Sequence, residues 1–304
     1  GGVALNCVSN GILLKEKIFD NIWIQPASGD AGGALGAALG AWHIHHQKKR
    51  HIKPNKDAMS GSYLGPAFSN KQIEKNLNAK RAVFQKFKSI DIIKKTALAL
   101  SEGKAVGWMQ GRMEFGPRAL GSRSIIADPR SNFMQKQLNL KVKYRESFRP
   151  FAPSILLQDL NKWFELDVES PYMLLVSDIK KNHQIQITKN EEKLFGIDKL
   201  NIPKSTIPAV THVDYSARIQ TVREDTNPRY FALINEFKKL TGCPILVNTS
   251  FNIRGEPIVC SPEDAFRCFM GTELDYLVIE DYFLDKNQQI NKSNNNYKDS
   301  YELD

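Results

Sequence analysis

Between residues 90 and 286, segments with helix signals alternate with short apolar segments, and this alternation constrains the fold more than any other feature. The segment "TNPRYFALINEFKKLTG" predicts a helix, because Asn227 and Pro228 suit its first positions and Gly242 suits its end. Helices are also predicted by "IIKKTALALSEGK", by "SNFMQKQLN" with Ser131 as its cap, and by "SPEDAFRCFMG", a capped helix with Pro262 at its first position. Strands are predicted by "AVGWMQ", "KVKYRESFRPFAPSILL", "YMLLVSDI", "CPILVNTSFN" and "LDYLVIEDYFL". The pattern predicts a mixed α/β (α+β) domain around a twisted sheet.

The segments on either side of this domain differ in character. Residues 1–42 contain "IFDNIWIQP", which predicts a strand, and "ASGDAGGALGAALGAW", which predicts a helix with Asp30 at its N-cap. Residues 43–89 are interpreted as a connector with one polar helix, "NKQIEKNLNAK". The Asn-rich tail from residue 287 predicts disorder. The chain starts at Gly1 inside what reads as a motif, so we expect a fragment of a longer protein.

Composition excludes several classes of protein. A length of 304 residues suits about two domains, and 41% hydrophobic with 25% charged residues is ordinary for a globular protein. No run of eighteen apolar residues and no secretory signal is present, so we expect no membrane partner and a cytoplasmic location. Without a CxxC pair, free thiols are favoured for Cys7, Cys243, Cys260 and Cys268. A solvated helix end is favoured over a metal cluster for His43, His45 and His46.

Positive charge is concentrated in one part of the chain. The net charge is +9, and residues 104–149 hold ten Lys or Arg against three Asp or Glu. This indicates an anionic partner, either a nucleic acid or a small phosphorylated molecule. Within this region, "GRMEFGPRALGSRSIIADPR" places four arginines on a loop shaped by Gly and Pro. Fixed guanidinium groups bind phosphate in a bidentate manner, so a phosphate pocket is favoured for Arg112, Arg118, Arg123 and Arg130.

The segment "KVKYRESFRPFAPSILL" adds further cations. On an extended strand, Lys141, Lys143 and Arg145 share one face, and Arg149 precedes a proline-fixed turn. An edge strand protected by lysines is the alternative for this stretch taken alone. Its neighbourhood favours an anion pocket. Glu114 and Asp128 flank the arginines and are expected to orient them.

Polar residues elsewhere complete the candidate set. His212, Asp214 and Arg218 lie in one short segment, where the histidine is either a proton acceptor or a structural turn residue. Asn248, Thr249, Ser250 and Asn252 follow a buried strand, a position where α/β sheets bind ligands. Ser250 lacks a G-x-S-x-G elbow, so a hydrogen-bonding role is favoured over a nucleophilic one. The Gly-rich N-terminal turns suit phosphate binding, and Asp30 is either a helix cap or a metal ligand.

Six motifs in order resemble the O-carbamoyltransferase family of nodulation-factor and antibiotic biosynthesis. They are "GGVALN", "PASGDAGGALGAAL", "GRMEFGPRALGSRSIIADPR", "KVKYRESFRPFAPS", "IPAVTHVDYSARIQTV" and "VNTSFNIRGEPIV". The resemblance implies the C-terminal part of an ASKHA (Kae1-like) domain in residues 1–50, a connector in 51–89, and a YrdC-like domain in 90–286. The disordered tail then covers residues 287–304.

The resemblance also implies roles for residues of the N-terminal part. Gly1, Gly2 and Asn6 match nucleotide-binding positions, and Asp30 matches a ligand of a catalytic metal, expected to be iron. The two histidine ligands of the family lie in an upstream HxxxH motif that is absent from this chain. The chain alone is therefore not expected to complete acyl transfer.

By the same resemblance, carbamoyl phosphate reacts with ATP and Mg²⁺ to give carbamoyl-adenylate, and the carbamoyl group passes to a hydroxyl of a small-molecule acceptor. Nucleic acid is then not a partner. The implied catalytic residues are Lys141, Lys143, Arg218 and Ser250. The implied substrate-binding residues are Arg118, Arg123, Arg145, Arg149, His212, Asn248 and Asn252. The alternatives are an RNA-binding or tRNA-modification-related YrdC-like module and a scaffold without catalysis. The carbamoyl-activating enzyme, in contrast to these alternatives, requires Arg118, Lys143 and Arg218 to meet in one cavity.

Overall fold

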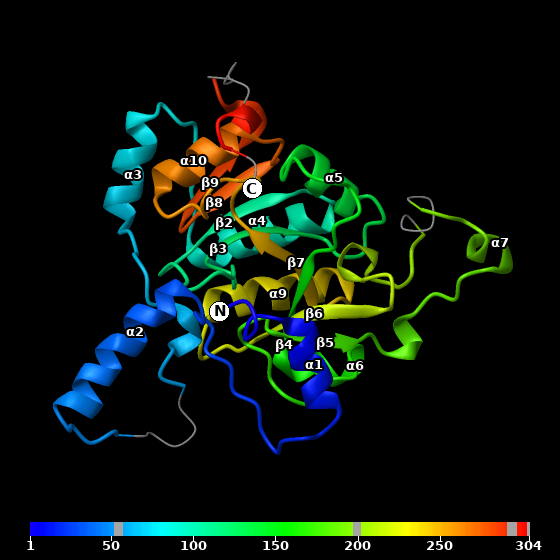
Figure 1. The fold of residues 1–304 in the computed structure, drawn as a ribbon. Helices are drawn as coiled ribbons and strands as arrows, with labels where there is room; N and C mark the ends of the chain where they lie inside the picture. Colours follow the sequence, from blue (N-terminus) through cyan, green and yellow to red (C-terminus); the bar gives the residue numbers. More distant parts are fainter. Residues whose placement is uncertain (52–56, 197–201, 291–296, 303–304) are drawn as a thin grey trace.

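The centre of the computed structural model is one nine-stranded mixed sheet with the strand order β1-β9-β8-β2-β3-β7-β4-β6-β5 (Figure 1). The structure describes residues 1–51, 57–196, 202–290 and 297–302. β2 pairs parallel with β8, β4 pairs parallel with β6, and the other neighbouring strands are antiparallel. The strands are β1 Gln85–Lys86, β2 Val106–Met109, β3 Arg123–Ala127, β4 Ala152–Leu156, β5 Leu175–Asp178, β6 Ser216–Val222, β7 Ile245–Ser250, β8 Tyr276–Ile279 and β9 Tyr282–Asp285. The predicted mixed α/β class is confirmed.

Helices connect and cover these strands. α4 packs against α9, α9 packs against β4 and β7, and α10 packs against α3, β2 and β8. The α-helices are α1 Cys7–Lys15, α2 Asp30–Gly40, α3 Asn70–Ala79, α4 Ser89–Ser101, α5 Met134–Lys141, α6 Leu160–Trp163, α7 Lys189–Glu192, α9 Pro228–Thr241 and α10 Pro262–Gly271. Single turns of other helix types are Ala41–His45, Ser60–Ser62, Leu157–Asp159, Lys181–His183, Pro208–Val210, Lys286–Gln288 and Tyr297–Asp299.

Local sequence signals set the ends of the long helices. Asn227 accepts a hydrogen bond from the Tyr230 amide at the start of α9, and Gly242 ends that helix at φ 77°. A side chain is strained at such a positive φ, so glycine is favoured there. Ser261 and Asp264 form a reciprocal capping box at the start of α10. The predicted positions of α9 and α10 are therefore confirmed.

The hydrophobic core lies between the sheet and these helices. Ile92 of α4, Trp108 of β2, Phe237 of α9 and Leu246 of β7 are fully buried in one cluster. The buried indole N–H of Trp108 donates to the Gly121 carbonyl at 3.0 Å, so its polar atom is satisfied. This core fixes the strand ends from which the candidate site is built.

The strand predicted for residues 18–26 is wrong. These residues pair with no strand among the described residues, and the side chains of Phe19 and Trp23 are exposed. Apolar alternation needs a neighbouring strand to become a sheet edge, and the sequence does not show whether one is near. The predicted helix in residues 27–42 is present as α2, although its N-cap is Gly29 and Asp30 is its first residue. α2 has no buried residue and projects from the rest of the molecule (Figure 1).

The strand predicted to start at Lys141 is also wrong. Lys141 ends α5, a loop follows, and β4 begins only at Ala152. Met134, Leu138 and Val142 are buried at four-residue spacing, so the helical period decided this stretch. Lys141, Lys143 and Arg145 therefore do not share one strand face.

Two further boundaries differ from expectation. α5 starts at Met134 with Phe133 as its N-cap, so Ser131 does not cap the helix directly. The last predicted strand is a hairpin of β8 and β9, and Glu280 adopts φ 46° at the turn between them. The segment "LDYLVIEDYFL" was predicted as one strand because such a tight turn leaves its apolar pattern almost uninterrupted.

The segments that flank the domain are packed against it. α1 lies on the edge strand β5, where a side chain on Gly11 would come within 2.3 Å of the Val176 carbonyl oxygen (Figure 1). α3, within the proposed connector, buries Ile73 in the main core. In contrast to the disorder expected from their composition, residues 297–302 are placed, and Tyr297 is buried. The rest of the tail beyond residue 290 lies outside the described residues, and the domain boundaries stay predictions.

Candidate functional site

Four guanidinium groups line one cavity of about 310 Å³, which we call the arginine pocket. Its arginines are Arg118, Arg145, Arg149 and Arg218. Its other lining residues are Pro117, Ala119, Pro150, Phe151, Ala152, Met173, Asn248, Thr249 and Ser250. None of the residues that line it is Asp or Glu, so among the described residues no carboxylate of its wall neutralises these cations.

Different elements contribute the arginines. Arg118 lies in the irregular loop between β2 and β3, and Arg218 lies on β6. Arg145 and Arg149 come from the loop between α5 and β4. This loop is held by Asn139 of α5, whose side-chain amide donates to the Arg149 carbonyl at 2.8 Å and whose Oδ1 accepts from Arg145 at 2.6 Å. The pocket is thus lined by two loops and by the last residues of β7.

Burial and like charge both act on these arginines. Burial, followed by the nearby Arg118 charge, lowers the pKa of Arg218 to about 10. Burial, followed by the Arg149 charge, lowers the pKa of Arg145 to about 10. Arg145 and Arg218 remain protonated at neutral pH, so the pocket concentrates positive charge. Arg149 is partly neutralised by Glu146 at 2.9 Å. A bound anion would relieve the remaining repulsion.

A neighbouring cavity of about 400 Å³, which we call the Lys143 cavity, is lined by the buried Lys143. It shares the lining residues Arg145, Arg149 and Ser250 with the arginine pocket, so the two cavities adjoin each other. Nζ of Lys143 lies 2.6 Å from the Ser250 carbonyl oxygen and 2.7 Å from Asn252 Oδ1. Burial and the adjacent Arg145 charge lower the pKa of Lys143 to about 7. This amine can therefore change protonation near neutral pH.

Two buried polar atoms of residues that line the arginine pocket have no hydrogen-bond partner among the described residues. They are Nε of Arg118 and Oδ1 of Asn248. Buried polar atoms are almost always paired in folded proteins, so an unpaired donor and acceptor beside a cavity indicate a site for a ligand.

Several predicted site residues lie elsewhere. Arg123 is fully buried, and its guanidinium donates to the carbonyls of Gln110, Gly111, Ser122, Pro66 and Cys260. Arg130 pairs with Asp128, and Arg112 donates to the Gly65 carbonyl. These arginines hold the loop in shape, and only Arg118 of the four lines the pocket. Glu114 accepts from the amides of Leu120 and Ser122 and so supports the same loop.

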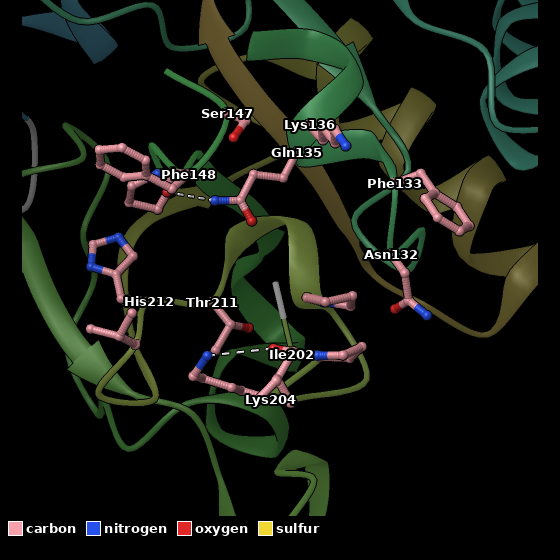
Figure 2. Close-up of a pocket in the computed structure, with 14 residues that line it drawn as sticks. Asn132, Phe133, Gln135, Lys136, Ser147, Phe148, Ile202, Lys204, Thr211 and His212 are labelled. Carbon is pink, nitrogen blue, oxygen red and sulfur yellow. Dashed lines mark hydrogen bonds between the residues drawn. The ribbon is translucent and has the colours of Figure 1, made fainter. Parts of the chain in front are cut away.

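Lys141 and His212 are also separated from the arginine pocket. Lys141 is exposed and pairs with Glu273 at 2.8 Å. His212 lines a different cavity of about 670 Å³, and burial lowers its pKa. Figure 2 shows His212 on the same side of this cavity as Phe148, with Asn132 and Phe133 opposite. Gln135 closes one wall, because its amide donates to the Phe148 carbonyl at 2.9 Å (Figure 2).

The N-terminal candidates form a separate group. Asn6 caps α1 by accepting from the Ser9 amide at 3.1 Å, and Gly1 and Gly2 are exposed. Asp30 is exposed at the start of α2. Within the part of the chain that the structure describes, no group of three or more His, Cys, Asp or Glu residues is arranged to hold a metal ion. Asp30 alone does not make a metal centre, so the metal assignment stays a prediction.

Sequence reasoning missed some residues of the site. Met173 lines the arginine pocket, and Cys7 of α1 lies near Arg218. Arg254 and Glu256 line the Lys143 cavity. No spacing signal marks Met173 or Cys7, because each reaches the site from an element distant in sequence. Arg254 and Glu256 follow Asn252 directly and could have been included on that ground.

The fold and the pocket together define an α/β protein with a cavity lined by four arginines. The chain matches the family models described as carbamoyltransferase C-terminus over residues 97–286 and carbamoyltransferase N-terminus over residues 1–39. The chain therefore belongs to the carbamoyltransferase family, and the resemblance found in its motifs is confirmed. No helix in the described part of the chain is long and apolar enough to span a membrane.

Curated relatives extend this finding. An uncharacterized protein of Synechocystis is 58% identical over 307 residues, covering 100% of this chain and 50% of the relative. Nodulation protein NolNO of Sinorhizobium fredii is 42% identical over 290 residues, covering 94% of this chain and 39% of the relative. A 3'-hydroxymethylcephem-O-carbamoyltransferase of Amycolatopsis lactamdurans is 31% identical over 267 residues, covering 85% and 43%. The chain thus spans half or less of the length of these relatives.

Proposed function

We propose that this chain is part of an O-carbamoyltransferase that moves a carbamoyl group to a hydroxyl of a small molecule. The family membership supports this reaction class, and one relative is named as a cephem O-carbamoyltransferase. The acceptor of that relative carries a hydroxymethyl group, as its name states. We further propose a cytoplasmic location and a small-molecule acceptor for the present protein.

We propose that the arginine pocket and the Lys143 cavity activate the carbamoyl group with ATP. Water first displaces phosphate from carbamoyl phosphate and leaves carbamate. A carbamate oxygen then bonds to the α-phosphorus of ATP, and pyrophosphate leaves with the electrons of the broken P–O bond. This gives carbamoyl-adenylate. In the transfer step the acceptor oxygen bonds to the carbonyl carbon, AMP leaves, and the hydroxyl proton is released.

The residues of the chain supply positioning and charge to these steps. Guanidinium forks bind phosphate oxygens in a bidentate manner and neutralise charge that develops as pyrophosphate leaves. We assign this role to Arg118, Arg145, Arg149 and Arg218. Lys143 provides a further buried cation next to Ser250, whose hydroxyl hydrogen-bonds Asn252 at 2.6 Å. The observation that carries the proposal is the convergence of four guanidiniums in one cavity without a lining carboxylate.

The implied cofactors fit this chain unequally. The arginine pocket has the positive charge and the unpaired Nε donor of Arg118 that suit the phosphates of ATP, with Mg²⁺ bound to the nucleotide. Asp30 supplies a single exposed carboxylate, which is too few ligands for a resident metal. We therefore derive no step through iron.

The activation step is tested with the chain itself. We expect pyrophosphate release from ATP that depends on carbamoyl phosphate, and a loss of about 10²–10³-fold in Arg218→Ala, as for removal of one oriented donor at a developing charge. The matched control is Arg223→Ala, because Arg223 follows the same strand but is exposed and pairs with Asp225 and Glu169. Normal turnover in Arg218→Ala, or an equal loss in both variants, would refute the assignment.

A further inference from the structure

Asn248 occupies the centre of the sheet at the edge of the arginine pocket. It lies on β7 between β3 and β4, and its side chain is only 1% exposed. Ser250, two residues further along β7, lines the same pocket, so the two side chains share a face of the sheet. The Asn248 side chain is therefore on the pocket face, although the sheet surrounds its backbone.

A chain of hydrogen bonds fixes which way the Asn248 amide points. Its Nδ2 donates to the Ala119 carbonyl at 3.1 Å and to Gln220 Oε1 at 2.8 Å. The Gln220 amide is itself oriented, because its Nε2 donates to the Leu120 carbonyl at 2.8 Å. Ser154 Oγ donates to the same Gln220 Oε1 at 2.5 Å. A flipped Asn248 would place Oδ1 against two acceptors, so this orientation is the satisfied one.

The consequence is a fixed acceptor without a donor. Oδ1 of Asn248 has no hydrogen-bond partner among the described residues. The guanidinium groups around the pocket offer only donors, and the Ser250 hydroxyl is engaged with Asn252 Oδ1. A ligand that pairs every polar atom of the pocket therefore carries an anionic group for the arginines and, close to it, an N–H or O–H donor for Asn248.

We infer that Asn248 selects the carbamoyl group by accepting a hydrogen bond from its NH₂. This inference rests on the proposed function and deepens it. Carbamoyl phosphate carries an N–H donor two bonds from the oxygen that bridges to phosphorus. Acetyl phosphate has the same charge and nearly the same shape, but a methyl group replaces the NH₂ and cannot donate. A site with a buried acceptor rejects an analogue that leaves this acceptor unpaired.

The test compares three anions by calorimetry on the intact chain: carbamoyl phosphate, acetyl phosphate and inorganic phosphate. We expect the wild-type protein to bind carbamoyl phosphate about tenfold or more tightly than acetyl phosphate. In Asn248→Ala, affinity for carbamoyl phosphate falls to that of acetyl phosphate, while acetyl phosphate and inorganic phosphate bind as before. The matched control is Ser154→Ala, which removes the other donor to Gln220 Oε1 and keeps the Asn248 acceptor.

The outcomes separate this inference from the proposed function. If the wild-type protein binds both acyl phosphates equally, the selective role of Asn248 is wrong while the arginine pocket keeps its function. If neither acyl phosphate binds, both proposals are wrong. An equal loss of affinity for all three anions in Asn248→Ala would show that Asn248 has only a structural role. Should that variant fail to fold, the wild-type comparison of the two acyl phosphates still decides.

Discussion

Replacing Arg123 with methionine distinguishes the arginines that hold the loop in shape from those that line the arginine pocket. Arg123 is 0% exposed, and its guanidinium donates to five backbone carbonyls at 3.0–3.3 Å. Removing the cation leaves these acceptors without a donor. Loss of one partner from a buried charged network costs about 3–5 kcal/mol. Because a domain of this kind is stable by about 5–15 kcal/mol, Arg123→Met should lose a large fraction of its free energy of unfolding.

The control is Arg118→Met. The Nε of Arg118 has no partner among the described residues, and its charge repels Arg218. The substitution should therefore leave the free energy of unfolding unchanged or raise it by up to about 1 kcal/mol, as expected for relief of a like-charge contact. Urea denaturation followed by circular dichroism measures both variants. A cost below about 1 kcal/mol for Arg123→Met, or equal costs for the two variants, would refute the reasoning.

Three further outcomes are expected. Gly11→Ala should push α1 off β5, because the new methyl would meet the Val176 carbonyl, and hydrogen exchange at α1 should rise; unchanged exchange would contradict the packing. Because the pKa of Lys143 is lowered to about 7, its charge is present below pH 7 and lost as pH rises. Between pH 6 and pH 9, the affinity for pyrophosphate should therefore fall more steeply in the wild-type protein than in Lys143→Met. Parallel plots of affinity against pH for the two proteins would show that Lys143 does not titrate in this range. Tyr297→Phe removes the hydroxyl that hydrogen-bonds Glu256 and should cost about 1–2 kcal/mol in urea denaturation; no change would show that the bond is not made.

Local signals in the sequence were sufficient for helices with polar caps. The start of α9 at Pro228 and of α10 at Pro262 followed from one cap residue and one proline each, because these signals act within a single turn. The strand prediction from Lys141 to Arg145 was wrong for the opposite reason. Its alternation fits a strand, whereas burial of Leu138 and Val142 on one helical face depends on elements distant in sequence.

The residue types of the site could be predicted from the sequence, but the role of each individual residue could not. Arg118 and Arg123 are five positions apart on one loop and look alike in the sequence. One lines the pocket and the other is enclosed by carbonyls, and only the folded loop distinguishes them. Lys143 does lie next to the pocket, but as part of a loop rather than as a member of a strand face. Charge pattern therefore located the region, and burial assigned the individual residues.

The contact between α1 and the sheet links the two regions matched by the family models. α1 rests on β5, β5 pairs with β6, and Cys7 at the start of α1 lies near Arg218 on β6. Displacing α1 would withdraw Cys7 from that guanidinium while leaving the arginine in place. The surroundings of this pocket arginine thus include residues from both regions that the family models match, so a change at α1 alters the neighbourhood of Arg218 as well as the edge of the sheet.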